Sequence, residues 1–301
     1  MSLNFSSINA LVIGDLMIDN YIEGNSTRMS PEAPVPVIIP KKEFSIPGGA
    51  ANVAMNLSSL GAKVSCAGAV GDDSWGSKLI KHLNAHNINT ENIEIFENFN
   101  TTIKQRIFSN GKQVIRIDTE DYFKKTCHFM NEKFDFYDLI ILSDYNKGIL
   151  TNNWFQKPKD SIVLLDPKKS FINFNQCDII TPNLNELQVL SGIEINTTED
   201  IILSCKNIID KYSLKYIIAK RGEDGITIVH KNASYEHIKA KHVHNPDVTG
   251  AGDTVIASLG LAFSITKNIS ASVKFSVAAA ALSVSKLGTA TVTIDEINNY
   301  I

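Results

Sequence analysis

The sequence predicts an α/β fold built on a mostly parallel central sheet. Short, continuous apolar runs alternate with longer amphipathic runs along most of the 301 residues. Continuous apolar strands separated by helices are typical of a parallel sheet covered by helices on both faces. Hydrophobic residues make up 44% of the chain, which suits one large domain of this kind. We therefore predict a single three-layer domain over residues 1–301.

The length and pattern of each run place the elements. The short apolar runs are the predicted strands: Ala10–Ile13, Val64–Val70, Leu139–Leu142, Ile162–Leu165, Ile179–Ile180, Tyr216–Ala219 and Ile226–Val229. The longer runs are the predicted helices: Ala51–Leu60, Ser74–Asn84, Thr198–Tyr212, Asp253–Phe263 and Ala271–Val284. Ligands of parallel sheets bind beyond the carboxyl ends of the strands. We expect the site there, at Gly14-Asp15, Ser143-Asp144, Asp166-Pro167, Pro182-Asn183 and Lys220-Arg221-Gly222.

Two segments interrupt this alternation, at about residues 18–40 and 101–118. The second alternates polar and apolar residues around Ser109-Asn110-Gly111, a pattern that predicts a β-hairpin. Together the two segments predict a small β-sheet that stands off the main domain. Because such a sheet would expose apolar edge surface, we expect it to form a lid over the site and to join two subunits in a homodimer.

The composition argues against several classes of function. A formal net charge of −3 without a long basic run disfavours nucleic-acid binding. No apolar stretch reaches the roughly 18 residues of a membrane span, and the N-terminus lacks the pattern of a signal peptide. The four cysteines form no paired motif, so we expect reduced thiols in a cytoplasmic protein.

The most informative segment is Asp247-Val248-Thr249-Gly250-Ala251-Gly252-Asp253-Thr254. Its glycines permit a tight turn close to a ligand, and the apolar run that follows predicts a helix. Free N–H groups and the positive dipole at a helix start bind anions such as phosphate. A carboxylate there suits a general base for a hydroxyl that attacks a phosphate. The pattern also fits a plain acidic helix start, whereas a dinucleotide-binding loop would need a third glycine.

Two blocks of the chain resemble the ribokinase-like (PfkB) family of carbohydrate kinases. The first is Gly48-Gly49-Ala50-Ala51-Asn52-Val53-Ala54 with Gly68-Ala69-Val70-Gly71-Asp72-Asp73 after it, and the second is Asp247 to Asp253. They occur in the family's order and spacing, and the resemblance runs nearly the full length. It implies a ribokinase-like fold and transfer of a phosphoryl group from ATP to a sugar hydroxyl, with Mg²⁺ as cofactor.

Within the family the chain is most similar to kinases of D-glycero-β-D-manno-heptose 7-phosphate. The likeness lies in Arg28-Met29-Ser30-Pro31-Glu32-Ala33-Pro34-Val35-Pro36-Val37 and Leu142-Ser143-Asp144-Tyr145-Asn146-Lys147-Gly148. It implies phosphorylation of the C1 hydroxyl to the 1,7-bisphosphate, in ADP-heptose synthesis for the lipopolysaccharide core. Many relatives also carry a nucleotidyltransferase. The chain has no His-x-Gly-His signature, so we expect no such activity in it, whether it is a stand-alone kinase or half of a bifunctional protein.

The resemblance also implies roles for individual residues. The catalytic base would be Asp253, and the transferred phosphoryl group would be stabilised by the backbone N–H groups of Gly250, Ala251 and Gly252. The sugar would be held by Asp19, Gly48, Gly49 and Asn52. From the residues alone, Asp19 could instead be a turn residue. Asn52 could cap the following helix, either instead of binding the sugar or in addition to it.

The nucleotide would lie near Lys220, Gly222, Gly225 and Asn183, with the adenine beside the helix predicted at Ala271–Val284. Asn183 and Glu186 match the family's Asn-x-x-Glu element, which organises Mg²⁺, and contact through water is expected because Mg²⁺ keeps several waters. Taken alone, the pattern is more typical of a helix start. The resemblance also implies a monovalent cation near Asp247 and Thr249.

A phosphorylated acceptor requires cations at the end of the pocket remote from Asp253. The candidates are Lys104, Arg106 and Arg116 on the hairpin and Lys147 and Lys168 at strand ends. Any one of them could be a surface charge, and Lys147 is favoured because it follows an acidic strand end. Two other functions stay open: another sugar or sugar-phosphate kinase, and a sensor without turnover, which the intact Asp253 disfavours.

Overall fold

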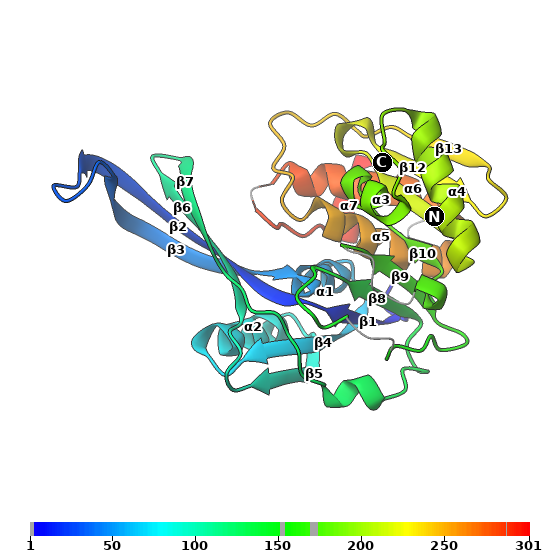
Figure 1. Ribbon diagram of the computed structural model, residues 1–301, viewed down its shortest axis with the longest axis horizontal. Helices are drawn as coiled ribbons and strands as arrows, with labels where there is room; N and C mark the ends of the chain where they lie inside the picture. Colours follow the sequence, from blue (N-terminus) through cyan, green and yellow to red (C-terminus); the bar gives the residue numbers. More distant parts are fainter. Residues whose placement is uncertain (1–2, 151–153, 169–173, 287) are drawn as a thin grey trace.

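The computed structural model describes residues 3–150, 154–168, 174–286 and 288–301 (Figure 1). Within them the larger sheet consists of β1 (Asn9–Gly14), β4 (Lys63–Gly71), β5 (Asn89–Phe96), β8 (Leu139–Ser143), β9 (Ile162–Asp166), β10 (Ile179–Ile180), β11 (Tyr216–Lys220), β12 (Ile226–His230) and β13 (Tyr235–Ile238). Their order is β13-β12-β11-β10-β9-β8-β1-β4-β5. Only the β11–β12 and β12–β13 pairs are antiparallel. The mostly parallel sheet predicted from the sequence is therefore confirmed.

Helices cover both faces of this sheet. They are α1 (Ala50–Ser59), α2 (Ser74–Ala85), α3 (Leu184–Ser191), α4 (Thr198–Tyr212), α5 (Ala251–Thr266), α6 (Ile269–Val284) and α7 (Ile294–Tyr300). Strand β1 divides two cores, because Ala10 and Val12 pack with α1, α5 and α6 while Leu11 and Ile13 pack with α4. The predicted three-layer arrangement is thus confirmed. Among the described residues no helix is long and apolar enough to cross a membrane.

The parallel register brings several strand ends to one edge of the sheet. Gly14 pairs with Ser143, and Ser143 pairs with Asp166, so β1, β8 and β9 end level with one another. A single bridge from Asn183 to Lys220 aligns the start of α3 with the end of β11. The polar residues that follow these strands therefore meet at one edge, where the sequence predicts the site.

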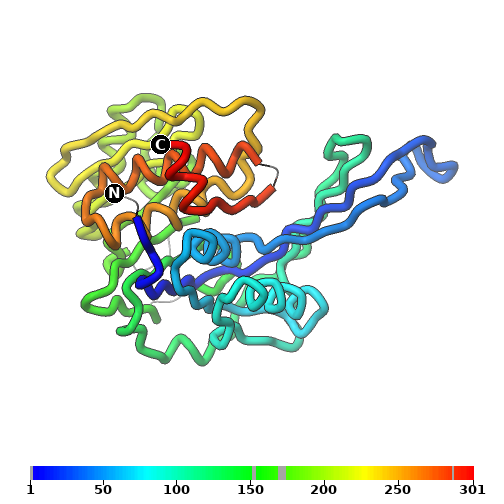
Figure 2. The backbone as a smooth tube through the Cα atoms, turned by 180° about the vertical axis from the view of Figure 1, so that it is seen from behind, coloured from blue at the N-terminus to red at the C-terminus, as the bar shows by residue number. Residues whose placement is uncertain are grey.

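The second sheet has four strands in the described residues. They are β2 (Leu16–Met29), β3 (Pro36–Gly49), β6 (Thr102–Ser109) and β7 (Lys112–Thr119), in the order β3-β2-β6-β7. Asn110 and Gly111 both have positive φ (49° and 77°), so the Asn-Gly turn joins β6 to β7 as its sequence predicts. This small sheet projects from the body of the molecule in Figures 1 and 2.

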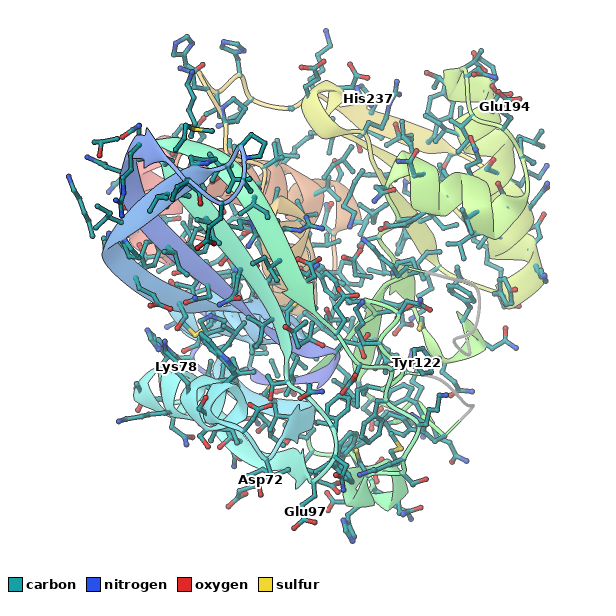
Figure 3. All side chains as sticks on the ribbon, turned by 60° about the vertical axis from the view of Figure 1, so that its left-hand side comes forward. Asp72, Lys78, Glu97, Tyr122, Glu194 and His237 are labelled. Atoms are coloured by element: carbon teal, nitrogen blue, oxygen red, sulfur yellow. The ribbon has the colours of Figure 1, made fainter. Side chains whose placement is uncertain are left out.

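The small sheet carries exposed apolar side chains. Met29 and Ile39 near its far end, and Val114, Ile115 and Ile117 on β7, are all exposed. Figure 3 looks toward this sheet, with the labelled Lys78 marking α2 beside its base. Its strands run on from the main domain, since β2 begins at Leu16 and β3 ends at Gly49, directly before α1.

Candidate active site

The start of α5 lacks a side-chain cap. Its N-cap is Gly250, which adopts a left-handed conformation with φ 76°. A Cβ at that position would lie 2.7 Å from the Asn52 amide nitrogen, so only glycine fits. The N–H of Ala251 donates to the Val248 carbonyl (3.2 Å) within the turn. The first N–H groups of a helix have no partner inside it, so this end of α5 can accept an anion.

Asp253 lies in the first turn of α5 with only 3% of its surface exposed. Each of its carboxylate oxygens accepts one hydrogen bond. The Asn52 amide donates to Oδ2 (2.7 Å), and the Tyr145 hydroxyl donates to Oδ1 (2.7 Å). Asn52 therefore does not cap α1, whose N-cap is Gly49 without a side-chain hydrogen bond. The alternative interpretation of Asn52 as a helix cap was wrong.

The charge environment of Asp253 suits a general base. Burial raises the pKa of its carboxyl from 3.8 to about 6, and the charge of Asp166 acts in the same direction. The hydrogen bonds from Asn52 and Tyr145 and the charge of Lys220 oppose that rise in pKa. A base is most effective when its pKa lies near the working pH and it is still ionised there.

Lys220 ends β11, next to the turn that precedes Asp253. Its ammonium group donates to Asp166 Oδ1 (2.5 Å), and that oxygen also accepts from the Thr181 hydroxyl (2.8 Å). A Cβ at Gly252 would lie 3.2 Å from Lys220 Nζ. Lys220, the cation predicted for the nucleotide, thus lies beside the turn that begins α5. Asp166 at the end of β9 holds the Lys220 ammonium group there, a role that the sequence did not predict.

The residues predicted to hold the sugar also come together. Asp19 on β2 is buried (4% exposed) and forms an ion pair with Arg106 of β6. A Cβ at Gly48 would lie 2.4 Å from Asp19 Oδ2, and Gly49 has φ 57°, so both positions require glycine. Asp19 lies within the small sheet rather than in a turn, which excludes the alternative interpretation of this residue.

The family can now be identified from the sequence as a whole. Residues 7–296 match the profile described as pfkB family carbohydrate kinase. The chain belongs to the pfkB family. It is therefore a phosphotransferase of the carbohydrate-kinase class.

Sequence relatives and structural neighbours are consistent with the assignment of this chain to the pfkB family. It is 40% identical to the bifunctional protein HldE of Aliarcobacter butzleri, over 97% of this chain and 64% of that protein, so it spans under two thirds of the relative's length. A putative ribokinase from Agrobacterium tumefaciens has a TM-score of 0.77 at 18% identity, covering 97% of this chain and 96% of the other. Arabidopsis thaliana ribokinase complexed with ribose and ATP gives 0.75 at 19% identity, over 97% and 98%. These structures support the ribokinase-like fold.

Four of the five cations predicted for a substrate phosphate are already paired in this pfkB-family chain. The pairs are Arg106–Asp19, Arg116–Asp118, Lys147–Glu120 and Lys168–Glu186. Lys104 is half-buried beside Asp19 on the neighbouring strand, and no carboxylate of the described residues pairs with it. The sequence favoured Lys147, whereas the geometry leaves Lys104 as the cation most available to a ligand.

Asn183 and Glu186 form the start of α3. The Asn183 side chain accepts from the Glu186 N–H (2.9 Å), and the Glu186 carboxylate accepts from the Asn183 N–H (2.8 Å). Glu186 Oε1 also accepts from Lys168 (3.0 Å). In the described parts of the chain no three His, Cys, Asp or Glu side chains gather to hold a metal. The role of Asn183 and Glu186 in organising Mg²⁺ through water stays a prediction.

The two glycines predicted for the nucleotide shape the turn after β11. Gly222 has φ 62°, and a Cβ added there would meet open space. A Cβ at Gly225 (φ 103°) would lie 2.2 Å from the Ile238 carbonyl oxygen. Asp247, predicted near a monovalent cation, accepts from the N–H groups of Gly288 (2.7 Å) and Thr249 (3.0 Å). Burial raises the pKa of Asp247, but these hydrogen bonds outweigh it and hold the pKa below its usual value.

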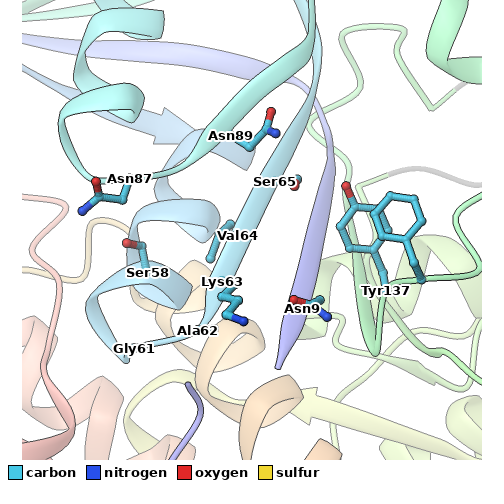
Figure 4. A pocket seen from close by; sticks show the side chains of 11 residues that line it. Asn9, Ser58, Gly61, Ala62, Lys63, Val64, Ser65, Asn87, Asn89 and Tyr137 are labelled. Atoms are coloured by element: carbon cyan, nitrogen blue, oxygen red, sulfur yellow. The ribbon is translucent and has the colours of Figure 1, made fainter. Parts of the chain in front are cut away.

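An open cavity of about 560 Å³ lies elsewhere in the molecule (Figure 4). It is at the amino ends of β1, β4 and β5, opposite the edge that carries Asp253. Its lining contains no carboxylate: Asn9, Ser58, Gly61, Ala62, Lys63, Val64, Ser65, Asn87, Asn89, Phe136 and Tyr137. The acid–base chemistry of the candidate active site is absent from this cavity.

Proposed function

We propose that the protein transfers a phosphoryl group from ATP to the C1 hydroxyl of D-glycero-D-manno-heptose 7-phosphate, giving the 1,7-bisphosphate. The observation that carries the proposal is the buried Asp253 in the first turn of the uncapped helix α5. A carboxylate in that place has a neutral donor on each oxygen and an anion-binding turn beside it. The likeness of the sequence to heptose 7-phosphate kinases supports the identity of the sugar.

In the proposed reaction, the sugar hydroxyl donates its proton to Asp253 as its oxygen attacks the γ-phosphorus. The N–H groups of residues 250–252 would stabilise charge on the transferred group, that of Ala251 by leaving its bond to the Val248 carbonyl. One such donor contributes about 3 kcal/mol by analogy with oxyanion holes. Lys220 lies beside this turn and would contact the phosphates. Mg²⁺, when bound, would neutralise phosphate charge, with Asn183 and Glu186 holding its waters.

The 7-phosphate would be bound from the small sheet. Lys104 lies next to Asp19, which would grip the sugar hydroxyls, and Arg106 lies two residues further along β6. Arg106 could bind the 7-phosphate while still paired with Asp19, because guanidinium groups bind phosphate bidentately. On this proposal the small sheet closes over the sugar as a lid.

The test of the function is a coupled ADP-release assay across several acceptors. We expect heptose 7-phosphate to be preferred strongly over ribose, fructose 6-phosphate, sedoheptulose 7-phosphate and unphosphorylated heptose. Comparable kcat/KM for phosphorylated and unphosphorylated sugars would reject the heptose-phosphate assignment and leave another sugar kinase as the function. Absence of turnover with all acceptors would favour the sensor.

A pair of variants tests the phosphate contact. Lys104→Ala should raise the KM for the sugar phosphate about tenfold or more while leaving the KM for ATP unchanged, because a charge-assisted hydrogen bond is lost. Lys147→Ala is the matched comparison, since Lys147 is already paired with Glu120. A larger effect at Lys147 would return the phosphate site to the strand end after β8.

We also propose a cytoplasmic homodimer joined through the small sheet. The exposed apolar side chains of that sheet, among them Met29, Ile39 and Ile115, support an interface. Light scattering at micromolar concentration should give the mass of a dimer. A monomer under those conditions, or a dimer that survives Ile115→Lys with Ile117→Lys, would contradict this interface.

A further inference from the structure

Tyr145 lies in a turn that the protein fixes firmly. The turn follows β8, and the buried Asp15 carboxylate accepts hydrogen bonds from the N–H groups of Tyr145 (2.8 Å), Lys147 (3.0 Å) and Ile149 (3.2 Å). Asn146 and Gly148 adopt positive φ (57° and 108°), which the tight turn requires. Asp15 itself follows β1 and is 2% exposed. The backbone that carries the Tyr145 side chain is therefore tied to the central strands of the sheet.

The Tyr145 hydroxyl donates to one oxygen of Asp253 while the Asn52 amide donates to the other, each at 2.7 Å. Rotation of the carboxylate would break both bonds. Each carboxylate oxygen has a second lone pair, so an acceptor hydroxyl can still bind without displacing either donor. The two donors arrive from different elements, α1 and the turn after β8, and this fixes the plane of the carboxylate.

The surroundings keep the phenol in its donating form. Burial, followed by the charge of Asp253, raises the pKa of Tyr145 well above its usual value. The Lys168 ammonium lies 5.5 Å from the ring centroid and is itself paired with Glu186. A tyrosine that does not ionise can only donate to the carboxylate that it faces.

We propose that Tyr145 is a positioning residue, which orients the Asp253 carboxylate toward the acceptor hydroxyl and favours its charged form. The inference rests on the proposed role of Asp253 as the base. A hydrogen bond to a carboxylate stabilises the ionised form, so the phenol keeps the base available at lower pH. The sequence gives Tyr145 no role, because its partner is more than a hundred positions away.

The experiment is Tyr145→Phe, which removes the hydroxyl and keeps the ring. We expect kcat to fall about tenfold with the KM for ATP unchanged, because a charge-assisted hydrogen bond is lost. The acid limb of kcat/KM should move up by about one pH unit. The other groups that face Asp253 are Asn52 on α1, Asp166 at the end of β9, Lys168 just after it and Lys220 at the end of β11. The variant leaves all of them in place.

Tyr137→Phe is the matched control. Tyr137 is also buried and hydrogen-bonded, to Ser65, but it lies at the opposite ends of the strands in the cavity of Figure 4. Its variant should leave the pH profile unmoved. Tyr145→3-fluorotyrosine should shift the acid limb of kcat/KM in the opposite direction to Tyr145→Phe. A more acidic phenol donates a stronger hydrogen bond to Asp253, so the acid limb should move to lower pH.

A readout without turnover separates this inference from the proposed function. The ¹³C resonance of the Asp253 carboxyl, assigned with Asp253→Asn, can be titrated in the wild-type protein and in Tyr145→Phe. A higher pKa of the Asp253 carboxyl in the variant supports the inference even if no sugar is phosphorylated. In that case only the proposed function fails. An unchanged pKa of the Asp253 carboxyl in Tyr145→Phe would overturn the role of Tyr145. A lower KM for the sugar at unchanged kcat would also overturn it, because the sugar would then displace the phenol from Asp253.

Discussion

The starts of helices α3 and α5 lie at the same edge of the sheet, yet they are built in opposite ways. At α3 the Asn183 and Glu186 side chains satisfy each other's backbone N–H groups in a complete capping box. At α5 a left-handed glycine precedes the helix, and no side chain within the described residues caps it. The capping box at α3 takes up the N–H groups of Asn183 and Glu186. At α5 no side chain of the described residues competes with a ligand for the first N–H groups of the helix.

The difference also explains the two carboxylates. Glu186 is fixed by its own helix and by Lys168, so its charge is compensated locally. Among the described residues, the side chains that donate to Asp253 are those of Asn52 and Tyr145, both neutral, and Lys220, whose charge acts on Asp253, is paired with Asp166. The carboxylate at α5 therefore keeps an elevated pKa and a free lone pair, which are properties of a base rather than of a cap.

The largest expected effect is at α5. Asp253→Asn should lower kcat by about 10²–10⁴-fold, because the amide cannot accept the proton of the attacking hydroxyl. Nucleotide and sugar binding should persist in equilibrium measurements. Near-normal turnover in a folded Asp253→Asn protein would show that Asp253 is not the base, and its carboxylate would then not differ in function from that of Glu186.

The second effect concerns the turn before α5. Gly250→Ala would introduce a Cβ 2.7 Å from the Asn52 amide and place alanine at φ 76°. We expect about 10–100-fold loss of kcat, since a small displacement of reacting groups is costly, and a stability loss of about 1 kcal/mol. Gly192→Ala is the matched control, because it also has a left-handed conformation (φ 71°) but open space around it. Equal losses of kcat in both variants would show that backbone strain alone is responsible.

The third effect is a pH dependence with a defined sign. Asp253 acts as a base only when it is ionised, and its pKa is raised to about 6. Activity should therefore be level above that pH and fall about tenfold per pH unit below it. A kcat/KM profile recorded between pH 5 and 8 checks this expectation. A profile that stays flat down to pH 5 would place the base elsewhere.

The smallest effect is at α3. Asn183→Ala should cost about 1 kcal/mol of stability through loss of the cap, and roughly 2–10-fold in the KM for MgATP if its waters are disturbed. Thr197→Ala removes the corresponding cap of α4, which has its own capping box. Thermal melts and the dependence of activity on MgATP, measured for both variants, show whether Asn183 has a role beyond capping. An unchanged KM for MgATP in Asn183→Ala would mean that Asn183 only caps α3.

Much of the fold was accessible from the sequence because local pattern dictates it. The continuous apolar runs of β1, β8 and β9 and the Asn110-Gly111 turn lead directly to the elements observed. Strand β13 was missed because it is a short, largely polar edge strand. Helix α3 was foreseen only as a possible helix start at Asn183–Glu186, because its eight residues are too few for a clear helical period.

Of the candidate site, the sequence by itself determined the chemistry of each strand end and helix start: the glycines at 250 and 252, the carboxylate at 253, and the cations nearby. Only the tertiary structure decided which of these groups are partners. Asn52, Tyr145 and Asp253 come from three distant segments. Lys147 and Lys168 are paired with carboxylates, whereas no carboxylate in the described part of the chain pairs with Lys104. The physical reason is that backbone conformation depends on neighbouring residues, whereas hydrogen bonds and pKa values depend on groups that meet only when the sheet has formed.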